Sequence, residues 1–398
     1  MLSSRLEKIK PSPTIAVTTK AKELRELGKD VIGLGAGEPD FDTHDNIKNA
    51  AIKAIKDEQT KYTAVDGIIQ LKKAIQEKFA RENKIDYDLT EITVGTGGKQ
   101  VLYNAFMASL NKGDEVIIPS PYWVSYPDMV LLAEGTPVLV TCPLENNFKL
   151  TPTQLEQAIT EETKWLILNS PSNPTGAAYS HEELENLANV IRKYKHVNVI
   201  CDDIYEHITY DNFKFYTLAS VAPDLRNRIL TVNGVSKAYA MTGWRIGYAA
   251  GPKALIKAMA KIQSQSTSNP TSIAQYAALE ALSGPQEYLQ DRNKAFLERR
   301  NFVIEKLTEI KGLKPYQAEG AFYIFCSCEE LIALQTPNGD TINNCTDFAS
   351  YLLDEALVAV VPGVAFGMKN YFRVSYATSN ENLKKACARI NEACKKLT

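Results

Sequence analysis

Short, wholly apolar runs that alternate with helical patterns are the feature that most constrains how this chain can fold. Seven such runs are expected to be strands, at residues 92–94, 115–119, 136–142, 165–168, 197–201, 229–232 and 246–250. Helical patterns fall between several of them, at residues 101–110, 151–159 and 182–194. Apolar strands separated by helices are typical of a largely parallel sheet that is covered on both faces. The sequence therefore predicts an α/β fold.

The two ends of the chain differ from this middle part. A total of 398 residues suggests more than one simple core. Near the C-terminus, apolar and polar residues alternate as they do in strands, which is typical of a smaller α+β domain. The expected strands of this domain are residues 321–325 and 372–376, and its expected helices are residues 348–355 and 382–396. We expect three parts, namely an N-terminal segment that packs with the small domain (1–45), a large domain (46–290) and a small C-terminal domain (291–398).

The N-terminal arm contains the run Lys10-Pro-Ser-Pro-Thr14. Two prolines in five residues predict an extended segment there. A helical pattern follows it and is expected to stop at Gly28, a residue type that favours helix C-termini.

Composition excludes several classes of function. A net charge of −2 gives no reason to expect a nucleic acid or a membrane surface as partner. The seven cysteines form no C-x-x-C pair, and the four histidines are scattered without metal-ligand spacing, so we expect reduced thiols and no metal site. The N-terminus has no apolar segment of signal-peptide length, and cytoplasmic localisation is expected.

Chemically distinctive residues follow the ends of the predicted strands. In a parallel α/β sheet, ligands bind beyond the carboxyl ends of the strands. Those ends are followed by Gly97, Gly98, Lys99, Trp123, Asn173, Asp202, Tyr205, Ser236, Lys237 and Arg245. Each residue alone has an ordinary structural explanation. Together they match one ligand, pyridoxal 5′-phosphate, which needs an amine for a Schiff base, a carboxylate for a ring nitrogen, and phosphate binders.

Several motifs also resemble those of a known family. The chain is similar over essentially its whole length to the fold-type I, class I aminotransferases that depend on pyridoxal phosphate, and in particular to the bacterial aspartate aminotransferases of subgroup Ib. The motifs are Ala36-Gly-Glu-Pro-Asp-Phe-Asp42, Lys61-Tyr62-Thr63, Thr96-Gly-Gly-Lys-Gln100, Ser120-Pro-Tyr-Trp123, Asn173-Pro-Thr-Gly176, Asp202-x-x-Tyr205, Ser236-Lys-x-x-x-Met-Thr-Gly-Trp-Arg245 and Phe372-Arg-Val-Ser375. The resemblance implies a mostly parallel seven-stranded sheet and a homodimer with shared active sites.

The resemblance also implies a role for each residue. Lys237 would carry the cofactor and act as the general base, and Asp202 would pair with the pyridine nitrogen. Contacts to the rest of the cofactor would come from Trp123 on the ring face, from Tyr205 and Asn173 at the ring hydroxyl, from Gly97, Gly98, Lys99, Ser236 and Arg245 at the phosphate, and from Tyr62 of the neighbouring subunit. Arg373 would hold the substrate α-carboxylate beside Gly37, Trp123 and Asn173.

Substrate preference depends on a few further positions. The stretch 266–272 has no arginine to hold a distal carboxylate, unlike animal-type aspartate aminotransferases, but subgroup Ib has a lysine where this chain has Lys99. Lys10 and Thr14 match positions that accompany prephenate transamination in that subgroup. The resemblance therefore implies ping-pong transfer from L-aspartate to 2-oxoglutarate, giving oxaloacetate and L-glutamate, together with conversion of prephenate to arogenate.

Other functions remain open at this point. The nearest alternative is an aromatic or alanine-type aminotransferase of the same fold. A nicotinamide-dependent oxidoreductase lacks support because the G-x-G-x-x-G fingerprint is missing. A cofactor-binding regulator without turnover would need an extra DNA-binding segment.

Overall fold

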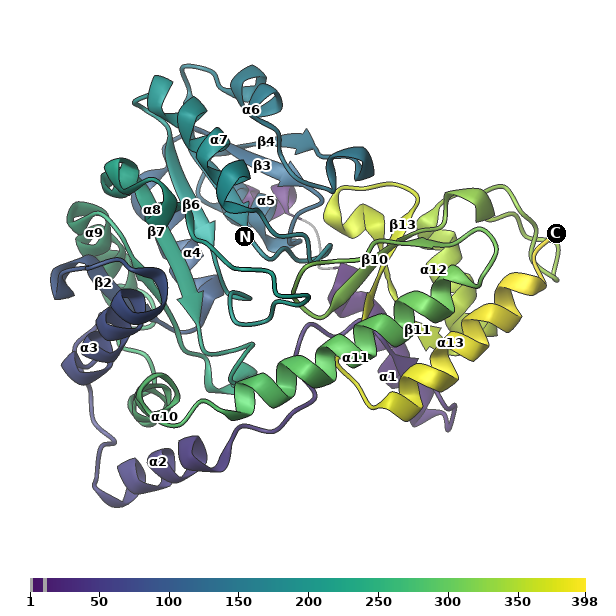
Figure 1. Ribbon diagram of the computed structural model, residues 1–398, viewed down its shortest axis with the longest axis horizontal. Coiled ribbons are helices and arrows are strands. Elements are labelled where there is room, and N and C mark those ends of the chain that lie inside the picture. Colours follow the sequence, from purple (N-terminus) through teal and green to yellow (C-terminus); the bar gives the residue numbers. More distant parts are fainter. Residues whose placement is uncertain (1–2, 10–12) are drawn as a thin grey trace.

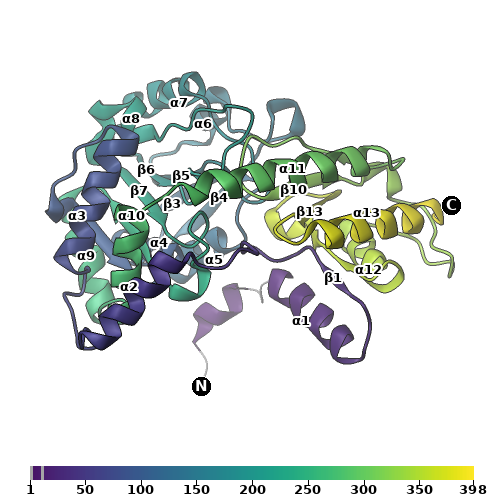
Figure 2. The same ribbon diagram turned by 60° about the horizontal axis from the view of Figure 1, so that its bottom comes forward.

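The computed structural model describes residues 3–9 and 13–398, with the side chains of residues 13–16 and 18 left aside. Figure 1 shows two groups of elements: a large sheet with helices on both sides, and a smaller group that contains the C-terminus. The long helix α11 (Tyr288–Thr308) runs from one group to the other (Figure 2).

The large sheet has seven strands in the order β2-β8-β7-β6-β5-β3-β4. Their bounds are β2 (Ile92–Gly95), β3 (Glu115–Ser120), β4 (Thr136–Thr141), β5 (Thr163–Asn169), β6 (Asn198–Asp202), β7 (Ile229–Gly234) and β8 (Gly247–Ala250). β8 is the one strand of this sheet that runs opposite to the others, antiparallel to both β2 and β7. The prediction of a mostly parallel seven-stranded sheet is confirmed.

Alternate residues of the central strands lie in two separate cores, one on each face of the sheet. In β6, Val199 and Cys201 belong to the larger core, whereas Ile200 belongs to the other. The smaller core packs under α4 (Gly98–Ser109), α5 (Ser125–Leu132) and α9 (Lys253–Ser264). Because both faces are buried, the strands are apolar throughout.

The remaining helices and short segments complete the large group. They are α2 (Asp45–Lys56), α3 (Ile69–Lys78), α6 (Pro152–Ala158), α7 (His181–Lys193), α8 (Leu218–Val221), α10 (Ser272–Ser283), the single π-turn η2 (Phe79–Asn83), and the 3-10 segments η1 (Ser4–Lys8), η3 (Leu89–Glu91), η4 (Leu144–Asn146), η5 (Pro223–Arg228) and η6 (Thr242–Trp244). Thr151 caps α6 by accepting a hydrogen bond from the Gln154 amide.

The smaller group is built on a four-stranded antiparallel sheet in the order β12-β13-β10-β9. Its elements are β9 (Lys314–Pro315), β10 (Tyr323–Ser327), η7 (Glu329–Leu331), α12 (Cys345–Glu355), β11 (Val358–Ala359), β12 (Val361–Pro362), η8 (Gly363–Phe366), β13 (Tyr371–Ser375) and α13 (Asn380–Lys395). The predicted α+β character is confirmed.

The N-terminal arm contacts both groups, and its contact with the large group includes an ion pair of 3.5 Å between Arg5 and Glu134. β1 (Ile32–Gly33) pairs in parallel with β11, and Val31 packs in one cluster with Leu353. Helix α1 (Pro13–Glu26) starts inside the segment expected to be extended, so that prediction is wrong for residues 13–14. The reason is that proline is tolerated at the first position of a helix, where no intrahelical N–H bond is lost. Residues 10–12 lie outside the described part of the chain.

Candidate active site

A cavity of about 500 Å³ lies at the carboxyl edge of the large sheet, where side chains from both groups of elements converge. Ten residues singled out from the sequence for a ligand-binding role line this cavity with Lys237: Gly37, Gly98, Lys99, Trp123, Asn173, Asp202, Tyr205, Ser236, Arg245 and Arg373. The structure therefore brings together residues that are up to 336 positions apart in the chain, Gly37 and Arg373.

Two other expected residues, Gly97 and Tyr62, are not among the residues that line the cavity. Gly97 lies directly behind Arg245. Tyr62 is 91% exposed. Lys10 lies outside the described residues, and so does the side chain of Thr14.

The carboxylate of Asp202 sits at the end of β6 and is held by a phenol. Tyr126 donates a hydrogen bond of 2.6 Å to Asp202 Oδ2. Burial raises the pKa of Asp202 to about 6, although the Tyr126 hydroxyl, the Ile204 amide and the charge of Lys237 all favour the ionised form. Sequence reasoning missed Tyr126, which lies in the first turn of α5, three residues after Trp123.

Lys237 follows β7 and points its amine across the cavity. Its Nζ donates a hydrogen bond to the carbonyl oxygen of Gly37. Burial and, after it, the positive charge of Arg373 lower the pKa of Lys237 to about 8, against the opposing effect of Glu38. A large fraction of this amine is therefore neutral at mildly alkaline pH, which is the form that acts as nucleophile or base.

The N-terminus of α4 and Arg245 form an anion-binding cradle. Gly97 has a φ of +83°, and a Cβ atom there would lie 2.2 Å from Nη2 of Arg245. Gly98 is the first residue of α4, so its end of the helix presents free backbone N–H groups and the positive end of the helix dipole. Arg245 reaches this position because β8 is antiparallel and starts at the same edge where β7 ends.

Lys99 adds a second cation beside the cradle. Its Nζ lies 5.0 Å from the centre of the Trp123 ring. Burial lowers the pKa of Lys99, and the charge of Arg245 lowers it further. The flat Trp123 side chain and this amine thus border the same part of the cavity.

Arg373, on β13, closes the opposite wall. Its Nη1 donates to Asn173 Oδ1 at 2.8 Å and its Nη2 donates to the Gly35 carbonyl at 2.7 Å, while its Nε is buried without a partner. The guanidinium carbon lies 4.4 Å from the centre of the Tyr323 ring. A buried guanidinium with an unused donor and no carboxylate partner among the described residues is suited to bind a carboxylate.

Tyr205 and Tyr323 form a second pair of side chains at this wall, with 2.8 Å between their hydroxyl oxygens. Sequence reasoning expected Tyr205 to face the ligand, but it gave no signal for Tyr323, which comes from a strand 118 residues away. Burial raises the pKa of the Tyr205 phenol well above its usual range, so the hydroxyl stays protonated and can donate.

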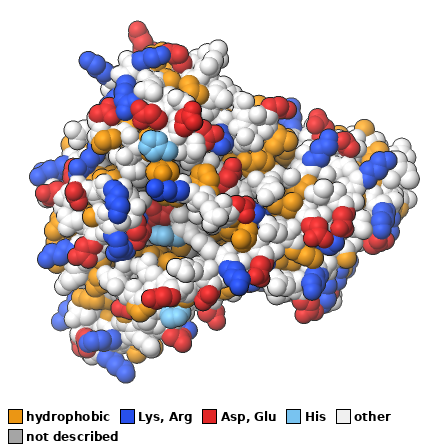
Figure 3. All heavy atoms as spheres, in the orientation of Figure 1, with side chains coloured by type: hydrophobic (Ala, Val, Ile, Leu, Met, Phe, Trp, Pro, Cys, Tyr) orange, Lys and Arg blue, Asp and Glu red, His pale blue; other side chains and the backbone are white. Residues whose placement is uncertain are grey.

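Lys, Arg, Asp and Glu side chains are interspersed over the face that Figure 3 shows. Within the described residues, no helix has the length and apolar character that a membrane crossing requires.

Comparisons with known proteins agree with this geometry. The family model described as aminotransferase class I and II matches residues 29–390. A probable aspartate/prephenate aminotransferase of Rickettsia bellii is 65% identical over 394 residues, with 99% of each chain covered. The aspartate/prephenate aminotransferase of Cereibacter sphaeroides is 61% identical over 393 residues, covering 99% of this chain and 98% of the relative.

The solved structures that resemble this chain include aspartate aminotransferases. The aspartate aminotransferase of Rhizobium meliloti has a TM-score of 0.98 at 54% identity and covers 100% of each chain. The aspartate aminotransferase of Thermus thermophilus with maleate has a TM-score of 0.92 at 45% identity and covers 99% of each chain.

Proposed function

This chain belongs to the class I and II aminotransferase family, and from that premise we propose that it transfers the amino group of L-aspartate to 2-oxoglutarate by a ping-pong mechanism. The products are oxaloacetate and L-glutamate. We further propose that prephenate is accepted and converted to arogenate. The observation that carries the proposal is the single cavity in which an amine of lowered pKa, a buried carboxylate, an anion cradle and a buried guanidinium face one another.

The cofactor proposed for this cavity is pyridoxal 5′-phosphate, which withdraws electrons from the substrate Cα when it is bound. The residues fit such a group. The cradle at Gly98 and Arg245 suits a phosphate, and the buried Asp202 carboxylate suits a protonated ring nitrogen. Trp123 offers a flat face for the ring.

Lys237 would serve first as the attachment point and then as the base. Its Nζ would take the proton from the substrate Cα, hold it as an ammonium and deliver it to the cofactor rather than back to Cα. A pKa near 8 suits this exchange at physiological pH, because neither protonation state is strongly favoured. Tyr126 keeps the Asp202 carboxylate oriented during both half-reactions through its hydrogen bond.

Two cations would recognise a dicarboxylic substrate. Arg373 presents a guanidinium to the α-carboxylate, and the Lys99 amine would attract the distal one. An aromatic or alanine-type activity is the alternative. It is less favoured because the Lys99 amine lines the cavity, where an uncharged substrate side chain would leave it without a partner.

The direct test measures steady-state transfer to 2-oxoglutarate from aspartate, phenylalanine and alanine. We expect kcat/KM to be highest for aspartate and the purified protein to show a visible absorption band. Lys237→Ala should lose the band and the turnover, whereas Lys149→Ala, at an ion pair outside the cavity, should keep both. Higher kcat/KM with phenylalanine or alanine would reverse the substrate assignment.

The prephenate activity is tested separately. Lys10 and Thr14 carry this expectation, and their side chains lie outside the described residues, so it rests on their match to the family and on Lys99. Incubation with prephenate and aspartate should yield arogenate. A double variant Lys10→Ala, Thr14→Ala should lose that product while transamination between aspartate and 2-oxoglutarate continues.

The assembly and cellular location remain proposals. The exposure of Tyr62 fits a role toward the cofactor phosphate of a neighbouring subunit in a homodimer. Sedimentation of the holoenzyme as a monomer would contradict it. The division into residues 1–45, 46–290 and 291–398 stays a prediction, as does cytoplasmic localisation.

A further inference from the structure

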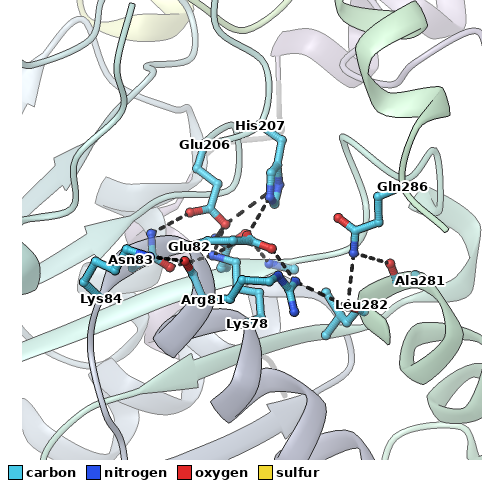
Figure 4. Close-up of polar contacts among 12 residues, drawn as sticks. Lys78, Arg81, Glu82, Asn83, Lys84, Glu206, His207, Ala281, Leu282 and Gln286 are labelled. Atoms are coloured by element: carbon cyan, nitrogen blue, oxygen red, sulfur yellow. Dashed lines mark hydrogen bonds and ion pairs between the residues drawn. The ribbon is translucent and has the colours of Figure 1, made fainter. Parts of the chain in front are cut away.

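A buried cluster of charged side chains lies behind the turn that carries Asp202 and Tyr205. Lys78, at the end of α3, and Glu206 are its centre, and Figure 4 shows them with Glu82, Asn83 and His207. Lys78 Nζ forms an ion pair with Glu206 Oε1, donates to Asn83 Oδ1 at 2.8 Å and lies 3.6 Å from Glu82 Oε2. None of these residues lines the main cavity.

Glu206 receives hydrogen bonds from three separate elements. Besides Lys78 of α3, Asn83 of η2 donates to Glu206 Oε2 at 3.1 Å, and Asn233 of β7 donates to Glu206 Oε1 at 2.7 Å. The Lys78 side chain is 0% exposed and that of Glu206 is 4% exposed, so water cannot replace these partners. Removing one member would leave a buried, uncompensated charge.

The cluster also offers three groups of the kind that bind metals. Ligand atoms of Glu82, Glu206 and His207 lie within 4.8 Å of one another. However, the Lys78 ammonium already contacts both carboxylates and supplies the positive charge that a metal ion would bring. The arrangement is therefore an internal ion-pair cluster.

The pKa values of the two glutamates, Glu82 and Glu206, are both lowered inside this cluster. Burial raises the pKa of Glu82, but the hydrogen bond from His207 and the charges of His207 and Lys78 outweigh it and lower the value to about 2. For Glu206, burial is likewise outweighed, chiefly by the charge of Lys78, and its pKa is lowered. The surroundings of both glutamates therefore favour their ionised form.

Glu206 is the residue directly after Tyr205, and Asn233 lies four residues before Lys237. The turn itself is tight, since the Glu206 amide donates to Asp203 O at 2.9 Å and the Ile208 amide donates to Tyr205 O at 2.8 Å. We propose that Lys78 and Glu206 are positioning residues, which fix the Asp202–Tyr205 turn against the end of β7 and so hold the carboxylate and phenol in register with the amine of Lys237. This inference rests on the proposed function.

The experiment compares Lys78→Met, Glu206→Gln and the double variant with the parent enzyme. Affinity of the cofactor-free protein for pyridoxal phosphate is measured by titration, together with the pH midpoint of the visible band in the loaded enzyme and with hydrogen exchange of residues 203–208. We expect Lys78→Met to lose at least about tenfold in cofactor affinity, to shift the midpoint and to speed exchange in the turn. The double variant should lose less, because no buried charge stays uncompensated.

Lys149→Met is the matched control. Lys149 is also mostly buried, pairs with Glu183 at 2.6 Å and donates to Ala178 O at 3.3 Å, all away from the cavity. We expect it to lower the unfolding midpoint without changing cofactor affinity. If the parent binds cofactor and both Lys78→Met and Glu206→Gln behave like this control, the positioning role is wrong. If Lys78→Met does not fold, Glu206→Gln alone decides, since a neutral amide keeps the shape of the side chain. A parent that binds no cofactor contradicts the proposed function instead.

Discussion

The raised pKa of Asp202 makes a quantitative prediction about the cofactor-free protein. Its carboxyl titrates at about 6 in the folded chain, against an ordinary value of 3.8. Between these two pH values the folded state binds more protons than the unfolded state, so folding stability falls as pH rises. The difference corresponds to about 3 kcal/mol at about 1.36 kcal/mol per pKa unit. At neutral pH, the ionised Asp202 should therefore destabilise the cofactor-free protein by that amount.

Replacing this carboxyl with an amide should recover the lost stability. Asp202→Asn removes the titration but keeps an oxygen that can accept the hydrogen bond from Tyr126. We expect the variant to match the parent near pH 4, to gain progressively up to pH 6, and to exceed it by roughly 3 kcal/mol above that. At the same time it should lose most of its catalytic activity, because an amide cannot stabilise a protonated ring nitrogen.

Urea unfolding followed by circular dichroism, at fixed subunit concentration and without cofactor, measures the difference. Asp45→Asn is the control, and its effect on the pH dependence of stability should have the opposite sign, because the hydrogen bond and charge of Lys48 lower the pKa of Asp45. Adding cofactor should reduce the advantage of Asp202→Asn, since the parent then has a partner for its charge. A stability difference that does not change between pH 4 and pH 7, or that favours the parent, would refute the reasoning.

Two further variants test the polar contacts of the site. Tyr126→Phe removes the hydroxyl that lies 2.6 Å from Asp202. The variant should raise the pKa of the Asp202 carboxyl by a further ~1–2 units, because a hydrogen bond to a charged group is worth about 1.5–3 kcal/mol. Carbon-13 NMR of the labelled carboxyl measures this pKa, and an unchanged titration midpoint contradicts the prediction. Gly97→Ala places a methyl group 2.2 Å from Arg245 at a φ of +83°, so cofactor affinity by calorimetry should fall about tenfold or more. Gly28→Ala, at a φ of +80° with nothing within 4 Å of its Cβ and outside the cavity, is the control, and equal losses of affinity would contradict the cradle.

Strand positions could be predicted from the sequence because burial on both faces makes the strands apolar throughout. The direction of β8 was not predicted. It depends on the connection 235–246, whose only helical part is the short η6 (Thr242–Trp244), and a parallel strand would need a longer crossover, usually a helix. Helices α5 and α9 were missed as well. α5 begins at Ser125, inside a short run of aromatic residues that ends at Tyr126 and has no helical pattern of its own.

At the site, the sequence predicted residue types but not their pairings. The family motifs and the strand ends together identified Asn173, Tyr205 and Arg373. The structure shows that Arg373 donates to Asn173 and that Tyr205 is paired with Tyr323. Such pairs join segments that are distant in the sequence, and a hydroxyl partner such as Tyr323 sits in an apolar strand pattern that gives no sign of it.

The electrostatics of the two buried clusters differ in a way that separates a binding site from a structural ion pair. In the cavity, burial prevails: it raises the pKa of Asp202 and lowers those of Lys237 and Arg373, so every one of these groups is less favourably charged than in water. Behind the turn, the cations prevail, and the pKa values of Glu82 and Glu206 are lowered despite burial. Charges that the protein leaves uncompensated need a partner from outside, and a ligand with an anionic end and a protonated nitrogen provides both signs. Compensated charges need none. The same desolvation that destabilises the empty cavity therefore increases its affinity for the ligand, while the Glu82 and Glu206 contacts keep the neighbouring turn in place whether or not the ligand is bound.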